Sequence, residues 1–385
     1  MKNLFKLFIA AAVVSAFAIT WSANLQASGK HPVVATNNDL KGPNSISIFK
    51  FNGTILTGPG TGPTGGKGIG GGFPGLNRMA FGGTSAVLCV FVSDAGGSSD
   101  IAAFKTVNKV ITKVGNYTDP QGSGKTQGIG LVVDSTYLLA AYTASKNIGA
   151  WQIQSDCTLT LLANFNTPFA IAGMRVTPNG KTLIVGYGSG VKKVDSFSLA
   201  TTGLTEHGPY PATSGASGVD ITKDSAYAIF GDTTKSKTEV EIYPIHADGT
   251  LGKRKHFGGK GSLGGGIGSS NVWLSVDEKF LFVSNTFSKQ VTSLGFTQKP
   301  LGLSYINITS VRNPSQIASV AQVGTLFATG NGQYIVLAED GSPNSFVAVL
   351  KINADGSTTE ISGSPFSNGQ GRGLQSFLVG PARPF

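Results

Sequence analysis

Two groups of residues with chemical potential recur at comparable places in this chain. The first group, acids and tyrosines that follow short apolar runs, comprises Asp94, Tyr142, Tyr187, Asp232 and Glu339. The second group, single cations in glycine-rich stretches, comprises Lys67, Lys125, Lys260 and Arg372. Carboxylates can act as general bases toward water, and cations gathered at a concave opening attract anionic or strongly polar ligands. We therefore predict these nine residues as ligand-binding candidates, while no residue is assigned as catalytic.

An alternative interpretation of the cations stays open. Lys67 lies in GGKGIGGG, Lys260 in GGKGSLGGG and Arg372 in GQGRG, and solvated glycine-rich loops tolerate a lysine or arginine anywhere. If the cations do converge, Asp94, Asp232 or Glu339 would be positioned to pair with them.

The candidate residues belong to a repeated unit, which is clearest over residues 176–208. This stretch contains an Asn179-Gly180 turn, an apolar run at 183–187, a third run at 191–199 and a short last strand near Leu204. Asn-Gly between apolar runs is a strong hairpin signal, and four short strands within about 45 residues are typical of a β-propeller blade. Similar second-strand runs occur at residues 33–37, 88–94, 138–143, 183–187, 228–232, 281–285 and 335–340. The sequence thus predicts an all-β, seven-bladed β-propeller.

The chain ends predict how the ring closes. The first unit lacks the innermost strand that the other units have before their second strand, and a spare strand follows the last unit at residues 374–379. We expect this C-terminal strand to pair beside residues 33–37 and complete the first blade, which removes the exposed edges of an open ring. Residues 28–385 are therefore predicted to form one domain.

Residues 1–27 are predicted to be a cleaved signal peptide. Lys2 and Lys6 precede an apolar core at residues 7–19, and Ala27 supplies the small residue at the cleavage site. This core is shorter than the roughly 20 residues that span a bilayer, and no later run is long enough to do so. We expect export to the periplasm or cell exterior, with no membrane span in the mature chain.

The composition disfavours nucleic-acid and cofactor binding. The formal charge is +10, but the basic residues are scattered, with no run longer than Lys253-Arg254-Lys255. Nucleic-acid binders gather such residues on one face and add aromatic side chains. The P-loop-like GSGKT at residues 122–126 precedes a predicted strand, whereas a phosphate site needs a helix there. No nucleic acid, cofactor or metal is predicted.

Cys89 and Cys157 are the only cysteines. An even number in an exported chain makes a disulfide possible. Cys89 lies in an apolar strand, where a free cysteine behaves as a small buried hydrophobe, whereas Cys157 lies in a turn of the next blade. The sequence favours unpaired cysteines without deciding the question.

Two turn-and-strand segments carry a resemblance to a known group. Thr177-Pro178-Asn179-Gly180-Lys181 is followed by the apolar run 183–187, and a second copy spans residues 276–285 (VDEKFLFVSN). In these segments the chain resembles the seven-bladed propellers of the YVTN-repeat and lactonase-like group. That resemblance implies catalysis by an inner-strand histidine with carboxylate and arginine partners in the central funnel. The predicted inner strands carry no histidine, and His207, His246 and His256 are expected to be solvated residues on outer parts of their blades.

The predicted function is a ligand- or partner-binding scaffold that uses the loops at the channel mouth. The partner could be a protein, a glycan or a small anionic or polar ligand. The alternative is a lactonase-like hydrolase acting on a small lactone in the central funnel, in which Lys67, Lys260 and Arg372 would hold the substrate. A structural or adhesive role at the cell surface is a third hypothesis.

Overall fold

The computed structural model describes residues 33–380 in part. The gaps lie at residues 72, 74–75, 84–86, 108–109, 126–127, 189, 201–202, 234–236, 260–261, 313–316, 328–332, 342–344 and 369–375. The predicted signal peptide, Lys260 and Arg372 therefore lie outside the described residues. No helix long and apolar enough to cross a membrane occurs in the described part of the chain.

The described strands form seven antiparallel sheets, here called blades 1 to 7 in chain order. Blade 1 contains β1 (Val33–Asn37), β2 (Gly42–Phe51), β3 (Leu56–Gly68) and β30 (Ser376–Gly380). Blade 2 contains β4 (Met79–Gly83), β5 (Leu88–Asp94), β6 (Asp100–Val107) and β7 (Val110–Thr118). Blade 3 contains β8 (Ile129–Asp134), β9 (Tyr137–Tyr142), β10 (Asn147–Ile153) and β11 (Leu159–Asn166). Blade 4 contains β12 (Gly173–Val176), β13 (Thr182–Gly186), β14 (Lys193–Ala200), β15 (Gly203–Glu206) and β16 (Tyr210–Pro211).

The remaining three blades repeat the order. Blade 5 contains β17 (Ala216–Ile221), β18 (Tyr227–Asp232), β19 (Val240–Pro244) and β20 (Lys255–Phe257). Blade 6 contains β21 (Ser269–Leu274), β22 (Phe280–Asn285), β23 (Gln290–Gln298) and β24 (Leu301–Ser310). Blade 7 contains β25 (Ile317–Phe327), β26 (Gln333–Gly341), β27 (Phe346–Ile352), β28 (Thr358–Glu360) and β29 (Phe366–Ser367). All seven predicted second-strand runs are observed as strands.

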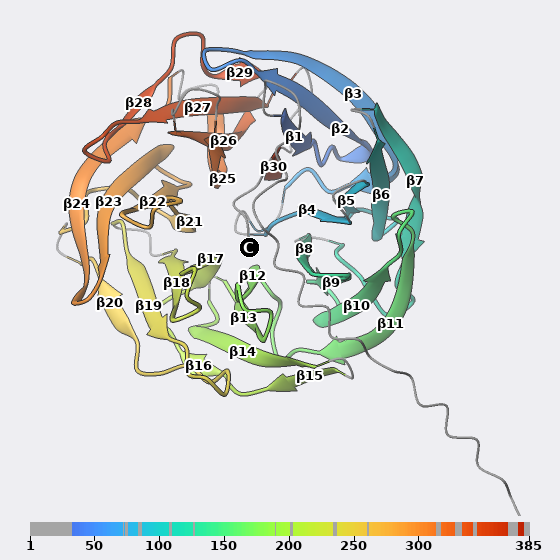
Figure 1. Cartoon of the computed structure of the whole chain (residues 1–385), viewed down its shortest axis with the longest axis horizontal. Coiled ribbons are helices and arrows are strands. Elements are labelled where there is room, and N and C mark those ends of the chain that lie inside the picture. The colour runs from blue at the N-terminus through green and yellow to red at the C-terminus, as the bar shows by residue number, and fades with distance from the viewer. Residues whose placement is uncertain are drawn as a thin grey trace, which may run out of the picture.

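The sheets are arranged around a central axis, with β30, β4, β8, β12, β17, β21 and β25 nearest the centre (Figure 1). The C-terminal strand β30 pairs antiparallel with β1, from Val33 opposite Gly380 to Asn37 opposite Ser376. The closure predicted from the two chain ends is therefore confirmed, and the protein is a seven-bladed β-propeller.

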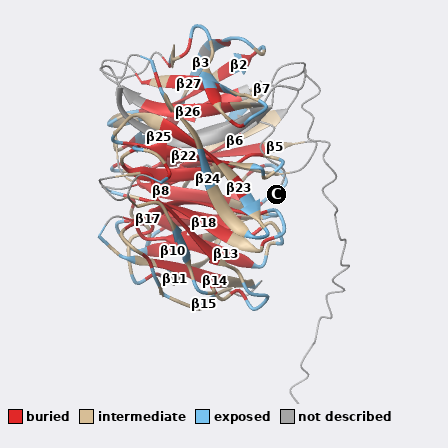
Figure 2. Ribbon diagram, turned by 90° about the vertical axis from the view of Figure 1, so that its left-hand side faces the viewer, coloured by how far each residue is buried: buried red, intermediate tan, exposed pale blue. Residues whose placement is uncertain are grey.

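Each hydrophobic core lies between two neighbouring blades. Seven buried clusters each combine apolar side chains from adjacent sheets; in one of them Phe230 and Tyr243 of blade 5 pack with Val194 of blade 4. Buried residues are concentrated in strands such as β13, β18 and β22, and exposed residues in the turns (Figure 2). Because every blade packs on both sides, the ring has no terminal sheet with an unpartnered face.

The two cysteines form a disulfide, so the expectation of unpaired cysteines was wrong. Cys89 in β5 and Cys157 in the turn before β11 are bonded, with Cα atoms 5.4 Å apart and a sequence separation of 68 residues. Packing of blade 2 on blade 3 brings them together, because both cysteines belong to the cluster between these blades. A turn at the edge of one sheet can reach into the neighbouring blade, so the position of Cys157 in a turn does not prevent pairing.

Reduction of this disulfide should destabilise the protein. A cross-link closing a loop of this length typically contributes about 2–4 kcal/mol by restricting the unfolded chain. We expect urea unfolding at equilibrium with dithiothreitol to show an unfolding free energy lower by that amount. The Cys89→Ser/Cys157→Ser variant should be insensitive to dithiothreitol, and a wild-type midpoint that the reductant does not change would contradict the assignment.

Candidate functional site

A buried polar side chain lies at the end of the second strand of every blade, or within two residues of that end. These residues, all at most 1% exposed, are Asn37, Asp94, Tyr142, Tyr187, Asp232, Asn285 and Glu339. Five of them are predicted site residues, so the structure brings their positions to equivalent places in the ring. We call this end of the molecule, where second strands end and the crossovers between blades pass, the mouth face.

Glycines in the crossovers make room for these polar ends. A Cβ atom on Gly66 would lie 2.4 Å from Oδ2 of Asp94, and one on Gly122 would lie 2.6 Å from the Tyr142 ring. Contacts this short are not tolerated, so any side chain at these positions would displace the crossover. The glycine-rich stretches of the sequence are thus explained in part by close packing over the second-strand ends.

Asp94 is held inside this packing. Its Oδ1 accepts hydrogen bonds from Asn44 Nδ2 at 2.7 Å and Thr64 Oγ1 at 2.8 Å, while Oδ2 has no partner among the described residues. Burial raises the pKa of Asp94 to about 7; the two hydrogen bonds oppose the rise, and the nearby Asp100 adds to it. Asp94 is therefore a buried acid that joins blade 1 to blade 2.

Tyr142, Tyr187 and Glu339 are likewise interior groups. The Tyr187 hydroxyl donates to Asp195 Oδ2 at 2.9 Å. Burial raises the pKa of both phenols above their ordinary value, with further contributions from Asp119 at Tyr142 and Asp195 at Tyr187. Burial, together with the nearby Glu360, raises the pKa of Glu339 well above its usual range. With side chains at most 1% exposed, none of the three offers a surface to ligand in this conformation.

The predicted cations are placed differently. Lys67, near the end of β3, and Lys125, on the crossover before β8, are exposed, and neither forms an ion pair with a described residue. Lys67 continues β3, where its carbonyl accepts a hydrogen bond from Gly96 N–H at 2.6 Å. The convergence of all four cations stays a prediction, because Lys260 and Arg372 lie outside the described residues.

Among the described residues, blade 5 carries a cluster of ionisable side chains near the mouth face. Strand β19 and the residue before it alternate acidic or aromatic with aliphatic side chains in the order Glu239, Val240, Glu241, Ile242, Tyr243. Alternate residues of a strand face opposite sides of the sheet. Val240 and Ile242 enter the core with blade 6, whereas Tyr243 enters the core with blade 4. Both glutamates therefore face blade 4.

Glu241 is fully compensated at this interface. Its Oε1 accepts from Arg254 Nη1 and from the Thr213 backbone N–H, each at 2.7 Å, and its Oε2 accepts from the Tyr243 hydroxyl at 2.9 Å. A buried carboxylate needs such partners, because an unpaired charge in the interior is strongly destabilising. Glu241 and Arg254 thus form a structural ion pair between blades 4 and 5.

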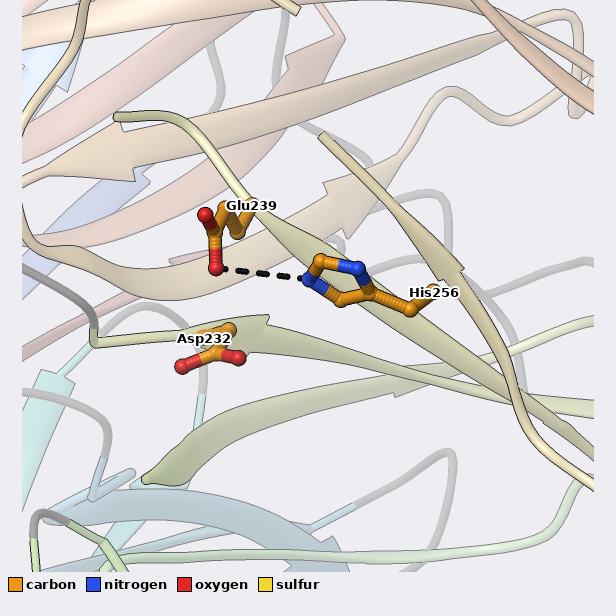
Figure 3. A group of neighbouring side chains, drawn as sticks. All are labelled: Asp232, Glu239 and His256. Atoms are coloured by element: carbon orange, nitrogen blue, oxygen red, sulfur yellow. Dashed lines mark hydrogen bonds and ion pairs between the residues drawn. The ribbon is translucent and has the colours of Figure 1, made fainter. Parts of the chain in front are cut away.

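A second group lies one step closer to the mouth. It comprises Asp232 at the end of β18, Glu239 immediately before β19 and His256 in β20, and we call it the blade-5 triad (Figure 3). Ligand atoms of the three side chains lie within 4.8 Å of one another. The His256 Nε2 atom is 3.3 Å from Glu239 Oε2, and its side chain is only 31% exposed. His256 is an exposed residue of the outermost strand, as expected, and it also contacts Glu239.

Strand register explains how the triad is assembled. Gly231 pairs with Val240 and Glu241 pairs with His256, so Asp232 lies opposite Glu239 and both glutamates share a face with His256. The Asp232 N–H donates to the Glu239 carbonyl at 3.0 Å, which continues the ladder past the strand end. Burial and the negative charges of Glu241 and Glu239 raise the pKa of Asp232 to about 6, while His256 opposes the rise.

A surface groove adjoins these groups on the outer flank of the ring. It has a volume of about 450 Å³ and is lined by Tyr210, Pro211, Tyr243, Leu251, Gly252, Lys253 and Arg254. This volume is in the range of small-molecule sites. Tyr243 is buried, so the accessible polar groups of this lining are Lys253, Arg254 and Tyr210, which suit a ligand with both an anionic group and a ring or carbon skeleton.

The inner strands contain another ion pair. Arg175 of β12 lies 3.1 Å from Oδ1 of Asp220 in β17, and its guanidinium stacks over the Trp273 ring of β21 at 4.7 Å from the centroid. Asp220 Oδ2 accepts the Leu274 N–H at 2.7 Å. Three consecutive blades are joined by this contact, which contains a carboxylate and an arginine near the axis without a histidine.

Comparisons with known proteins establish the fold alone. No family model and no curated protein matches the sequence. Among solved structures, the chain is similar to a putative 6-phosphogluconolactonase from Bacteroides uniformis, with a TM-score of 0.69 and 12% identity over 91% of this chain and 100% of that one. It is similar to the periplasmic gluconolactonase PpgL of Pseudomonas aeruginosa, with a TM-score of 0.68 and 13% identity over 91% and 98%. A hypothetical selenium-binding protein from Sulfolobus tokodaii has a TM-score of 0.69 and 9% identity over 93% and 95%.

These findings define the class. The protein is a seven-bladed β-propeller whose structural neighbours include lactonase-like propellers.

Three residues of blade 5 were missed by reasoning from sequence: Glu239, His256 and Arg254. A signal was present in the alternation Glu239-Val240-Glu241-Ile242-Tyr243, with Arg254 and His256 two residues apart in the next strand. Two acids on one face of a strand and two cations on one face of its neighbour favour a cross-strand polar cluster. Asp232 was predicted as a site residue for its place at a strand end, not for these neighbours.

The Asp94→Asn substitution should change how stability depends on pH. Burial raises the pKa of Asp94 to about 7 in the folded protein, whereas the unfolded chain releases the proton near the ordinary aspartate pKa of 3.8. The contribution of Asp94 to stability is therefore present below pH 4 and is lost as pH rises from about 4 to 7. The wild type should lose unfolding free energy over this pH range, whereas the variant has no carboxyl proton to release. The unfolding free energy of the variant minus that of wild type should therefore be larger at pH 8 than at pH 4 by on the order of 3 kcal/mol.

Urea unfolding of both proteins at the two pH values measures this difference. Asp277→Asn, at a half-exposed ion pair of a turn, serves as control and should not show a gain with rising pH. Parallel pH profiles for Asp94→Asn and wild type would contradict the raised pKa.

Proposed function

We propose that the protein is an exported propeller that acts as a binding scaffold for a small anionic or polar ligand. The observation that carries the proposal is the groove between blades 4 and 5, where the exposed Lys253 and the half-buried Arg254 lie beside the half-buried Tyr210. A rigid ring that presents such a groove has the usual design of a ligand site, with polar groups on an apolar wall.

The groove also has a preorganised cation. Arg254 is fixed by Glu241 Oε1 at 2.7 Å and by Thr213 Oγ1 at 2.9 Å, both through its Nη1 atom. An arginine that is held in place loses little conformational entropy when a ligand binds. Lys253 is exposed and adds a mobile second charge at the edge of the same groove.

Export is supported by the sequence of residues 1–27, with its basic start, apolar core and Ala27. One neighbour in fold is named as a periplasmic protein, the gluconolactonase of Pseudomonas aeruginosa. The predicted mouth-face cations Lys67, Lys125, Lys260 and Arg372 remain candidates for a second contact surface for a protein or glycan.

Gluconate and 6-phosphogluconate are suitable first probes, because the named neighbours concern sugar-acid lactones and the groove carries positive charge. We expect isothermal titration calorimetry to detect binding of at least one of them, weakened roughly fivefold by Lys253→Met through loss of a charge-assisted contact. Lys255→Met is the matched control, because Lys255 reaches the Leu301 carbonyl in blade 6 instead. Absence of binding at millimolar probe, or equal affinities for wild type and Lys253→Met, would refute this site.

A lactonase-like hydrolase is the second candidate function. It is favoured by the pairing of Arg175 with Asp220 on the inner strands, since the fold neighbours include proteins named as lactonases. In this hypothesis Asp220, which is buried in this conformation, would have to become accessible before it could direct water toward the lactone carbonyl.

Hydrolysis of a lactone panel in a pH-stat tests this hypothesis with three proteins: wild type, Asp220→Asn, and the double variant Lys260→Ala/Arg372→Ala. If the protein is a hydrolase whose catalytic groups lie on the inner strands, Asp220→Asn should lower turnover at least tenfold. A loss confined to the double variant would instead assign it to the mouth loops. No turnover above background in wild type would exclude lactonase activity on the panel.

A further inference from the structure

We propose that the blade-5 triad, Asp232, Glu239 and His256, is a binding site for a divalent transition-metal ion, for which Zn²⁺ is the best match. The site is independent of what the neighbouring groove binds.

The donor set fits this class of ion. One imidazole nitrogen and two carboxylate oxygens are ligands that zinc accepts, and two carboxylates neutralise the charge of a divalent ion. Calcium and magnesium prefer oxygen ligands alone, so the histidine selects against them. Three protein ligands leave one position of a tetrahedron for water or a ligand.

The geometry needs little adjustment. Two ligands of a tetrahedral zinc ion, each about 2.0–2.2 Å from the metal, lie roughly 3.3–3.5 Å apart. His256 Nε2 and Glu239 Oε2 are already 3.3 Å apart, and the ligand atoms of all three residues lie within 4.8 Å of one another. Figure 3 shows the imidazole directed at Glu239, with the Asp232 carboxylate beside this contact. Small rotations of the side chains would bring the third ligand into range.

An unsatisfied buried atom is a second, independent observation. Asp232 is completely buried; its Oδ1 accepts hydrogen bonds from Ser214 Oγ and, at 3.4 Å, from Gly215 N–H. Its Oδ2 has no hydrogen-bond partner among the described residues. Buried carboxylate oxygens are normally hydrogen-bonded or ligate a metal, so an orphan atom next to two other ligands points to a cation.

The surroundings hold the ligands in place without competing for them. Ser214 orients Asp232 from one side, as the outer hydrogen bonds of metal sites usually do. The adjacent acid, Glu241, is engaged by Arg254, Tyr243 and the Thr213 backbone, so it neither adds a fourth charge nor needs the ion. The three ligands come from adjacent strands of one sheet, which fixes their spacing by register.

Zinc binding by the purified protein tests the proposal. After treatment with EDTA and dialysis, Zn²⁺ is titrated against a chromophoric chelator, and Co²⁺ is added separately to record the absorption of a tetrahedral site. We expect one ion per chain, with affinity at least tenfold lower in Glu239→Gln and in His256→Ala. The control His246→Ala alters an exposed histidine in the turn of the same blade and should bind as wild type does.

Each outcome decides the question. Circular dichroism in EDTA confirms that the variants are folded, and Glu239→Gln keeps the test valid if His256→Ala is not. The proposal fails if wild type binds no Zn²⁺ at micromolar concentration, or if Glu239→Gln binds it equally well. It also fails if His246→Ala loses binding to the same degree, because that result would indicate nonspecific Zn²⁺ binding by surface histidines. Displacement of Zn²⁺ by equimolar Ca²⁺ or Mg²⁺ would likewise contradict it.

Discussion

The structure depends on the pairing of β30 with β1, which joins residues at opposite ends of the chain in one sheet. All seven blades pack on both faces only because this pairing closes the ring. In an open arrangement blades 1 and 7 would expose the apolar faces that now form their common core, which includes Val34, Phe49 and Val347. The hydrophobic contacts between blades are therefore conditional on a backbone ladder of five residue pairs.

Ring closure also explains why polar groups are buried at the mouth face. The second strands converge there and the crossovers pass over their ends, so each last side chain is enclosed by its own blade and the preceding crossover. Asp94 and Asn37 satisfy this environment with hydrogen bonds to Asn44, whereas Glu339 has no hydrogen-bond partner among the described residues. The acids kept in this environment have raised pKa values because burial disfavours the charged form.

The interface of blade 5 with blade 4 contains buried acidic side chains beside its apolar packing. One face of β19 packs against blade 6 with Val240 and Ile242, and the other presents two glutamates to blade 4. Such polar contacts between sheets cost desolvation free energy, which Arg254 offsets for Glu241. At Asp232 only one carboxylate oxygen has hydrogen-bond partners among the described residues, so the desolvation cost of the other is not offset. The Asp232 oxygen without a partner is the observation on which the proposed metal site depends.

The sequence by itself determined the propeller, the number of blades, their second strands and the closing strand. These follow from local signals: Asn179-Gly180 and similar turns, runs of alternating or continuous apolar residues, and the unequal chain ends. It also placed Asp94 and Asp232 at strand ends on one face. What it could not determine were contacts that depend on register and on neighbouring blades. The Cys89–Cys157 disulfide, the pair Arg175–Asp220 and the approach of His256 to Glu239 each join residues on different strands, and only the packing of sheets sets those distances.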